Sequence, residues 1–236
     1  MGSSVYKAAK RLFDILSAAA AIILTSPLWL ISIIGIKISS KGPILYKSHR
    51  VCQDNKPFTM YKFRSMHVFQ PTAETAGKRS EGSFVGNKRI FGFGSFMRKA
   101  KIDELPQLLN ILFGQMSVVG PRPVSAESAA KNYVGEYACI SKVRPGLACL
   151  DSLFDYTHGE LFVTDNNEYI QKVIPVRREL AKRYVEKQSV GLDVYCILRT
   201  VKLIFEIMIL KKRKFPYTKY EQEAETRVFG SAAAKL

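Results

Sequence analysis

A long apolar run near the N-terminus is the strongest hydrophobic pattern in the chain. Residues 15–36 carry no charged side chain, and Ser26 and Pro27 lie near the middle of this run. Because about 20 apolar residues cross the hydrocarbon core of a bilayer, the run predicts a membrane-associated helix. Proline removes a backbone donor and clashes with the preceding turn, so a bend or break is expected at Ser26 and Pro27. The hydroxyl of Thr25 or Ser26 is placed to satisfy a carbonyl that the proline leaves unpaired.

Basic residues at both ends of the run favour a re-entrant arrangement. Lysine and arginine concentrate on the cytoplasmic side of membrane helices. Here they precede and follow the run, at Lys7, Lys10, Arg11, Lys37, Lys41, Lys47 and Arg50. We therefore expect a helix that enters the membrane, breaks and returns to the same face. A proline-kinked transmembrane helix is the alternative. A cleaved signal peptide is disfavoured, because the run is long and no small-residue cleavage site precedes a secreted-looking domain.

The segment after the run predicts a strand-turn-strand unit between residues 42 and 66. Short apolar runs at 43–46 and 58–63 flank the turn-forming sequence DNKP at 54–57. The polar, glycine-containing stretch 69–88 is expected to be a mobile loop near the active surface.

Helical periodicity dominates the remainder of the chain. Leucines at 105, 108, 109 and 112 predict a helix that opens at Asp103 and ends at Gly114. Further helices are predicted at 125–137, 175–188 and 193–210. The basic residues of 175–188 indicate a solvated face, or a lipid-contacting one beside a membrane. The helix at 193–210 is amphipathic and should be interfacial or packed in the core. We expect an α/β fold that is mostly helical around a small sheet.

Length and composition indicate one compact domain seated on a membrane. About 200 residues follow the apolar run, which is enough for one sizeable core. The expected boundaries are 8–40 for the re-entrant helix, 41–215 for a cytoplasmic domain with interfacial amphipathic helices, and 216–236 for a C-terminal tail. Residues 230–236 resemble a linker or cloning scar. The four cysteines are scattered without a zinc-site spacing, which indicates reduced thiols.

The charge balance points to anionic partners. Lysine and arginine number 36 against 20 acidic residues, which gives a formal net charge of +16. Such a field attracts nucleic acid, anionic lipid headgroups or phosphorylated substrates. Beside a membrane segment, lipid and phosphate are favoured. The absence of a recognition helix, zinc finger or aromatic-studded sheet motif argues against nucleic acid.

Asp103 and Glu104 are the leading candidates for chemistry. A helix N-terminus stabilises negative charge and lowers a carboxylate pKa, which suits a nucleophile or a metal ligand. Ordinary helix capping is the alternative. Arg98 precedes the pair, and Arg122 follows the same helix between two prolines. Carboxylates among guanidinium groups, with room for Mg²⁺, suit attack on a diphosphate because the cations neutralise the phosphate oxygens.

Four ordered motifs resemble those of the bacterial sugar transferase family, the monotopic polyprenyl-phosphate phosphoglycosyl transferases. They are YKFRSM at 61–66, DELPQL at 103–108, SVVGPRP at 117–123 and VRPG at 143–146. The sequence KRLFD at 10–14 and the break at Ser26 and Pro27 are similar to the membrane segment of that family. The resemblance covers about residues 8–210. With one strongly apolar segment, the chain resembles the small form of the family.

The resemblance implies a two-step displacement with a covalent intermediate. Asp103 would attack the β-phosphate of a UDP-sugar and release UMP, and undecaprenyl phosphate would then take the phosphosugar. Mg²⁺ would bind at Asp103 and Glu104, and Arg98 would contact phosphate. The loop formed by Pro121, Arg122 and Pro123 would help to hold the nucleotide. Further substrate-binding candidates, each with a structural ion-pair role as the alternative, are Lys62, Arg64 and Arg144.

The resemblance also implies a place in the cell. The enzyme would lie in the bacterial inner membrane, on its cytoplasmic face among inner-membrane lipid, and begin a surface polysaccharide or glycoprotein glycan. A homodimer is left open, as is the identity of the sugar.

One segment departs from the family pattern. Many members continue after Arg-Pro-Gly with a Thr-Gly pair and an aromatic-Gln segment, whereas here LACLDS follows at 147–152. His158, farther along the same region, has either a surface or capping role or a substrate contact. The rival hypotheses are a conventional glycosyltransferase that releases UDP and a non-enzymatic basic membrane scaffold.

Overall fold

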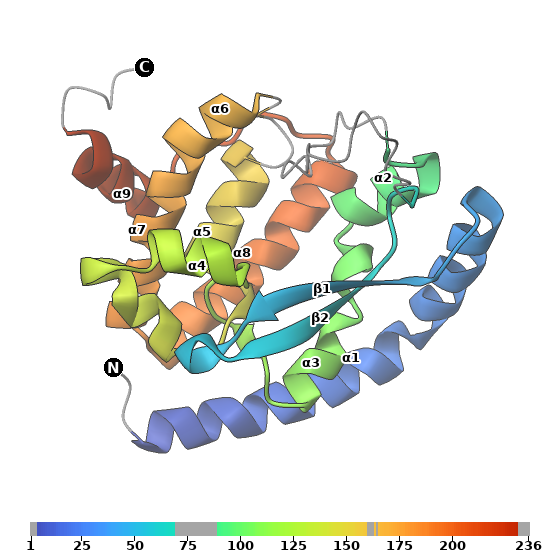
Figure 1. The fold of residues 1–236 in the computed structure, drawn as a ribbon, viewed down its shortest axis with the longest axis horizontal. Coiled ribbons are helices and arrows are strands. Elements are labelled where there is room, and N and C mark those ends of the chain that lie inside the picture. The colour runs from blue at the N-terminus through green and yellow to red at the C-terminus, as the bar shows by residue number, and fades with distance from the viewer. Residues whose placement is uncertain (1–3, 69–88, 160–162, 164, 231–236) are drawn as a thin grey trace.

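Helices make up most of the described chain, and two small sheets lie among them (Figure 1). The computed structural model describes residues 4–68, 89–159, 163 and 165–230, so the predicted loop at 69–88 lies outside the described residues. The helices are α1 (Ser4–Ser39), α2 (Gly92–Lys99), α3 (Gln107–Leu112), α4 (Ala126–Asn132), α5 (Leu150–Phe154), α6 (Asn166–Glu168), α7 (Ile174–Glu186), α8 (Val190–Met208) and α9 (Lys219–Phe229). The strands are β1 (Leu45–Val51), β2 (Pro57–Phe63), β3 (Ser117–Val119) and β4 (Gly146–Ala148). The mostly helical fold predicted from the sequence is confirmed.

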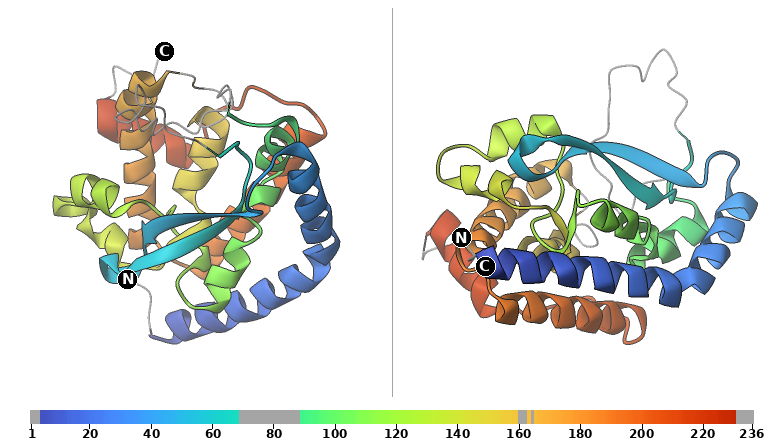
Figure 2. Two further views of the ribbon diagram at one scale, coloured as in Figure 1. Left: turned by 45° about the vertical axis from the view of Figure 1, so that its right-hand side comes forward. Right: turned by 90° about the horizontal axis from the view of Figure 1, so that it is seen from below.

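Helix α1 continues through Pro27, and its axis changes direction along its length (Figures 1 and 2). The Ser26 hydroxyl donates to the carbonyl of Ile23 at 2.8 Å, which is the carbonyl that the missing amide of Pro27 leaves without its usual donor. The Thr25 hydroxyl donates to the carbonyl of Ala21 at 2.6 Å. The predicted repair is therefore confirmed for Ser26, whereas Thr25 bonds to a carbonyl that Pro27 does not affect. The predicted break takes the form of a bend in a continuous helix.

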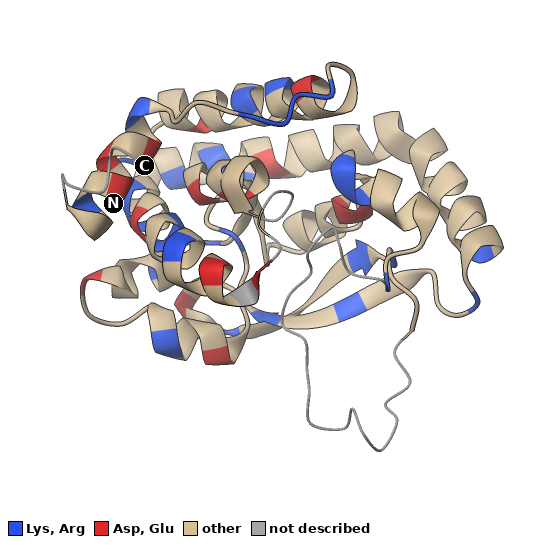
Figure 3. Cartoon of the chain, turned by 90° about the horizontal axis from the view of Figure 1, so that it is seen from above, with Lys and Arg blue, Asp and Glu red and all other residues tan. Residues whose placement is uncertain are grey.

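The surface of α1 is unusually apolar for a helix facing water. Among the described residues, α1 is the one helix that is long and apolar enough to cross a membrane. Leu24 is 79% exposed, and large aliphatic side chains are exposed along much of its length. Figure 3 shows that charged residues are confined to its ends. Exposed apolar surface of this extent is compatible with association with a membrane.

The KRLFD sequence at 10–14 anchors α1 to the rest of the fold. Asp14 is buried and accepts hydrogen bonds from the Ser117 hydroxyl at 3.0 Å and the Val118 amide at 2.9 Å. The guanidinium of Arg11 donates to the last carbonyls of α3, as a cation at a helix C-terminus can. Lys10 pairs with Asp193 of α8 at 2.6 Å. These contacts hold α1 against α3, β3 and α8.

The predicted strand-turn-strand unit is confirmed. Strands β1 and β2 pair antiparallel, with Leu45 opposite Phe63 and Val51 opposite Pro57. Their connection places Asp54 and Asn55 at φ of 58° and 57°, a left-handed conformation that these two residue types tolerate better than most.

Strands β3 and β4 pair in parallel and bring two sequence motifs together. Ser117 lies opposite Gly146 and Val119 opposite Ala148. A Cβ atom on Gly146 would collide with the backbone amide of Gly120, so glycine is required for this close approach. The amide of Gly146 donates to the carbonyl of Pro121 at 2.9 Å. The loop that carries Arg122 is thereby fixed to the VRPG motif.

Two predicted helices are shorter than expected. The helix predicted from Asp103 is split into a 3₁₀ turn, Ile102–Glu104, and α3, which begins after Pro106 and ends before Gly114 at φ 79°. Helix α4 begins at the N-cap Ser125, as predicted, but ends at Asn132, before Gly135 at φ 57°. The predicted end of the first helix at Gly114 is confirmed, whereas Pro106 divides its start and the prediction for 125–137 extended across Gly135.

The C-terminal helices enclose the largest part of the core. Leu180 and Tyr184 of α7 and Cys196 of α8 are fully buried within it. The prediction of a solvated basic face for 175–188 is wrong for Arg177 and Lys182, because both side chains pair with carboxylates from other elements. Helices α7 and α8 otherwise lie where they were predicted.

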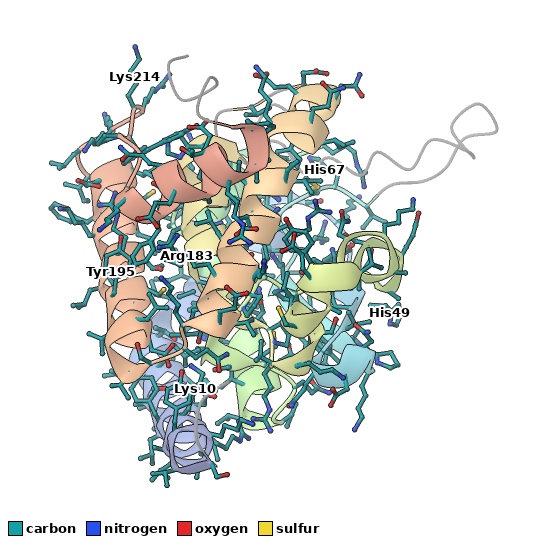
Figure 4. All side chains as sticks on the ribbon, turned by 90° about the vertical axis from the view of Figure 1, so that its left-hand side faces the viewer. Lys10, His49, His67, Arg183, Tyr195 and Lys214 are labelled. Carbon is teal, nitrogen blue, oxygen red and sulfur yellow. The ribbon has the colours of Figure 1, made fainter. Side chains whose placement is uncertain are left out.

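Helix α9 folds against α7 within the segment predicted as a tail. Thr218 and Glu221 form a capping box at its N-terminus. Arg183 of α7, labelled in Figure 4, pairs with Glu223 of α9. Arg227 of α9 pairs with Glu179 of α7 at 3.2 Å. Residues 231–236 lie outside the described part of the chain.

Candidate active site

Asp103 and Glu104 occupy the 3₁₀ turn between α2 and α3. The turn follows Lys101, whose left-handed φ of 57° reverses the chain direction after α2. Both carboxylates are turned inward, with Asp103 5% and Glu104 9% exposed. The Lys62 ammonium of β2 lies 2.9 Å from Oε1 of Glu104, and the Arg122 guanidinium lies 3.6 Å from the same oxygen. Three motifs that are far apart in the sequence therefore meet at Glu104.

The two carboxylates differ in their electrostatic state. Burial raises the pKa of Asp103, with Lys62 opposing the shift and the negative charge of Glu104 adding to it. Burial also acts to raise the pKa of Glu104, but the charges of Lys62, Lys101 and Arg122 outweigh it and hold this pKa below its usual range. The expectation that a helix dipole lowers the pKa of Asp103 is wrong. Asp103 lies in a buried 3₁₀ turn rather than at an α-helix N-cap, and desolvation dominates there.

One oxygen of Asp103 lacks a protein partner. Its Oδ1 atom is buried and accepts no hydrogen bond from the described residues. Leaving such an atom unsatisfied costs free energy, and exceptions of this kind commonly mark functional positions. The raised pKa makes the ionised carboxylate a more basic oxygen than an ordinary aspartate. Asp103 is therefore suited to act as a nucleophile or to bind a cation.

The segment that leads into the dyad is held by further contacts. Arg98 lies in α2, is buried, and contributes a positive charge that opposes the raised pKa of Asp103. The Tyr156 hydroxyl donates to the carbonyl of Lys99, and the Lys101 ammonium lies 4.5 Å from the centre of the Tyr156 ring. The predicted proximity of Arg98 to the carboxylates agrees with this arrangement.

Arg64 and Arg144 are engaged in structural contacts. Arg64 is buried and donates to the carbonyl of Pro43 and to both the hydroxyl and the carbonyl of Ser40, which ties β2 to the end of α1. Arg144 donates to the carbonyl of Gly114 at 2.9 Å. These partners favour the structural alternative for both arginines, and we do not include them in the proposed site.

Sequence reasoning missed a group of charged residues behind Arg122. The backbone amide of Arg122 donates to Asp151 at 3.1 Å, and the side-chain Nε atom of Arg122 lies 3.7 Å from Asp155. Arg177 of α7 pairs with both aspartates. The spacing of four between Asp151 and Asp155, which places both on one helical face, was the available signal.

His158 contacts other residues of the fold through both its ring face and its Nε2 atom. Its ring stacks on Phe154 at 5.0 Å, and its Nε2 atom donates to the carbonyl of Phe215 at 3.1 Å. These contacts connect the end of α5 to the segment that leads into α9, and they favour a structural role over substrate contact.

The dyad also fits a magnesium ion that is shared with substrate. Mg²⁺ prefers oxygen ligands and is commonly held by one or two carboxylates together with substrate phosphates. Asp103 and Glu104 supply two carboxylates, one with an oxygen that lacks a partner. No group of three or more potential His, Cys, Asp or Glu ligands occurs in the part of the chain that the structure describes. Two carboxylates are a donor set that phosphate oxygens of a substrate would complete around a cation.

Comparison with known proteins connects this geometry to a family. The model of the bacterial sugar transferase family matches residues 5–207. A UDP-glucose:undecaprenyl-phosphate glucose-1-phosphate transferase of Klebsiella pneumoniae is 36% identical over 81% of this chain and 39% of its own length. A protein of the same name from Caulobacter vibrioides is 34% identical over 81% of this chain and 68% of its own length.

A relative with a different sugar in its name is similarly related. The UDP-N-acetylgalactosamine-undecaprenyl-phosphate N-acetylgalactosaminephosphotransferase of Aeromonas hydrophila is 33% identical over 86% of this chain and 45% of its own length. The chain spans only 39% and 40% of the lengths of two glucose-1-phosphate transferases that it matches. The family match nevertheless includes every element of the site, from β2 to the loop that carries Arg122. The chain therefore belongs to the bacterial sugar transferase family.

Proposed function

We propose that this chain transfers a sugar 1-phosphate from a UDP-sugar to undecaprenyl phosphate or a similar polyprenyl phosphate and releases UMP. The names of its relatives support this reaction class. The observation that carries the proposal is the buried Asp103, which has an oxygen without a partner among the described residues and lies beside a Glu104 that is held by Lys62 and Arg122.

The reaction proceeds in two displacements at phosphorus. In the first, a carboxylate oxygen of Asp103 forms a bond to the β-phosphorus, the bond to the bridging oxygen breaks, and UMP leaves with that oxygen. In the second, a phosphate oxygen of the lipid attacks the same phosphorus and releases the Asp103 carboxylate, which gives a lipid diphosphate sugar. A covalent intermediate lets a soluble nucleotide sugar and a lipid phosphate use one site in turn.

The surrounding cations make attack by an anion on a diphosphate feasible. Lys62, Arg98 and Arg122 reduce the repulsion between the Asp103 carboxylate and the phosphate oxygens. Pro121 and Pro123 limit the conformations of the loop that presents Arg122 to the nucleotide. Asp103 and Glu104 would hold Mg²⁺, which supplies charge neutralisation at the diphosphate.

Exposed apolar surfaces on two helices support a location of the site beside a membrane. Helices α1 and α8 run alongside each other (Figure 2), joined by the pair of Lys10 and Asp193. Helix α8 exposes an apolar stripe at helical spacing, formed by Val190, Val194, Leu198, Val201, Phe205 and Ile209. We propose that α1 is re-entrant, with both ends at the cytoplasmic face of the bacterial inner membrane, and that α8 lies in the interface. The dyad then lies near the lipid headgroups, where the acceptor phosphate resides.

The released nucleotide distinguishes this function from its rivals. The detergent-purified protein is incubated with Mg²⁺, undecaprenyl phosphate and a panel of UDP-sugars, and the nucleotide products are separated by chromatography. We expect UMP together with a lipid diphosphate sugar. UDP as the product would indicate a conventional glycosyltransferase, and no nucleotide from any sugar would favour a non-enzymatic scaffold. The same panel identifies the sugar, because the names of relatives include both glucose and N-acetylgalactosamine.

A further inference from the structure

A buried cluster of charged and polar side chains lies behind Arg122. The Arg177 guanidinium lies 3.4 Å from Oδ2 of Asp155 and 3.8 Å from Oδ2 of Asp151. The Tyr169 hydroxyl accepts a hydrogen bond from Arg177 at 2.6 Å and donates one to Oδ1 of Asp155 at 2.7 Å. We call these four residues, Asp151, Asp155, Tyr169 and Arg177, the rear cluster.

The rear cluster contacts Arg122 at two points. Oδ2 of Asp151 accepts the backbone amide of Arg122 at 3.1 Å, which fixes the loop. Oδ2 of Asp155 lies 3.7 Å from the side-chain Nε atom. The opposite edge of the same guanidinium faces Glu104 at 3.6 Å. Arg122 is thus held between the rear cluster and the catalytic dyad.

The two aspartates of the rear cluster lie between two positively charged side chains, Arg122 and Arg177. Arg122 and Arg177 would repel each other in a partly buried environment, and the two carboxylates lie where they offset that repulsion. The Asp155 side chain is 4% exposed, and that of Arg122 is 23% exposed. An arginine that already pairs with Asp155 and Glu104 is oriented before the substrate arrives.

The space around Asp155 also restricts its side chain. A Cβ atom added to Gly159 would collide with Oδ1 of Asp155 and would lie 3.1 Å from the Tyr169 ring. The end of the short π-helix Asp155–Gly159 therefore packs directly against the carboxylate. Its orientation is set by packing as well as by hydrogen bonds.

We propose that Asp155 is a positioning residue that orients the guanidinium of Arg122 toward the substrate diphosphate, while Asp151 fixes the loop backbone. This inference rests on the proposed function, because it gives Arg122 a phosphate to meet. It also assigns a role to the segment at 147–152, which departs from the family pattern and supplies Asp151. Through Asp151, this divergent segment then supports the loop that carries Arg122.

A double-mutant cycle tests whether Asp155 acts through Arg122. The variants are Asp155→Asn, Arg122→Gln and their combination, and the readout is kcat/KM for UMP release. We expect Asp155→Asn to lower kcat/KM about tenfold or more, because misplacing a group by about 1 Å is costly to catalysis. In the Arg122→Gln background the further loss should be less than about twofold, since residues that act as a unit are not additive. Equal losses in both backgrounds would overturn the proposal.

A matched control separates positioning from general loosening of the fold. Glu179 is another buried carboxylate, which lies on α7, pairs with Arg227 and accepts a hydrogen bond from Tyr137. Glu179→Gln should change kcat/KM by the same factor in both backgrounds. Coupling to Arg122 as large as that of Asp155 would overturn the proposal, because it would indicate a nonspecific effect.

Two further measurements keep the test decisive. If Asp155→Asn does not fold, Gly159→Ala replaces it, because the added methyl group displaces the Asp155 carboxylate without removing any charge. If the wild-type protein releases no UMP, the proposed function is rejected and kcat/KM cannot be measured.

In that case the Tm of each variant in the cycle is measured by thermal unfolding. Non-additive shifts in Tm support the contact between Asp155 and Arg122, and additive shifts overturn it.

Discussion

Asp103 is a buried carboxylate with a raised pKa, and asparagine preserves its size while removing its negative charge. Asp103→Asn should abolish the covalent phosphosugar adduct, measured by intact mass after incubation with the UDP-sugar in the absence of lipid acceptor. Loss of a nucleophile of this kind lowers kcat by about a thousandfold or more. Asp54→Asn, which changes an exposed aspartate in the β1-β2 connection, serves as the control and should retain the adduct. An unchanged adduct in Asp103→Asn would remove Asp103 as the nucleophile.

His158 should make stability depend on pH. Burial lowers its pKa, against opposing effects of Glu221 and the Phe215 carbonyl. The unfolded chain therefore binds this proton more tightly than the folded one, and the free energy of unfolding should fall as pH drops below the unfolded value of about 6.5. The measurement is Tm against pH for the wild type and His158→Gln, which should lose this contribution. His49, which lies at the edge of the molecule in Figure 4 and is exposed, provides the control His49→Gln. An identical pH profile for His158→Gln and the wild type would contradict the prediction.

Individual site residues were predictable where a sequence motif carries them. Asp103, Glu104, Lys62 and Arg122 lie in such motifs, and the structure brings them together. Arg64 belongs to a motif as well, but its guanidinium faces the end of α1, which the sequence pattern does not reveal. The rear cluster was missed because its ion pairs join α7 to α5 and the turn after it, and such pairing depends on tertiary packing.

At the scale of elements, the parallel pairing of β3 and β4 determines where Arg122 is presented. Gly146→Ala places a methyl group against the Gly120 backbone and should destabilise the fold by about 1–3 kcal/mol, as overpacking does. It should also weaken UMP binding, measured by calorimetry, because the Arg122 loop moves. The control is Gly191→Ala in α8, where an added methyl group meets no atom within 4 Å. That change should be neutral or raise Tm slightly, since alanine favours helix. A Gly146→Ala protein with unchanged Tm and UMP affinity would refute this interpretation.

Element type was more predictable than element length. The strand pair and helices α7 and α8 follow from hydrophobic periodicity, which is strong in each of them. The division of the dyad helix at Pro106 and the early end of α4 depend on local backbone geometry, including left-handed residues such as Lys101 and Gly135. Position in the fold also decides whether a basic residue is solvated, and Lys182 is buried because Glu136 lies opposite it.

At the scale of the whole molecule, the proposed re-entrant arrangement of the bent α1 predicts which side of the membrane each of its ends faces. Single cysteines introduced before Lys10 and after Lys41, in a background without the native cysteines, should both react with a membrane-impermeant maleimide only from the cytoplasmic side. The physical reason is the cluster of basic residues at each end of the apolar run. Labelling of the two positions from opposite sides would show that α1 spans the bilayer. The cysteine-free background must retain UMP release for the result to apply.

The overall architecture was predictable to the level of one long apolar N-terminal helix and a mostly helical fold with small sheets. The apolar run and its flanking charges are properties of the sequence itself. How α1 docks was not apparent, because Lys10, Arg11 and Asp14 each bind a different element that is distant in the sequence. The same holds for α9, whose contacts with α7 come from side chains that carry no periodic signal of their own.

The ion pairs of Arg177 also limit how members of this family can be recombined. A chimera that grafts residues 147–159 from a relative onto this chain would exchange Asp151 and Asp155 but retain Arg177 on α7. Where the donor segment lacks those carboxylates, a buried guanidinium loses its partners, at a cost of about 3–5 kcal/mol. A chimera should therefore exchange residues 147–159 and 166–186 together, so that Arg177 keeps its two carboxylate partners.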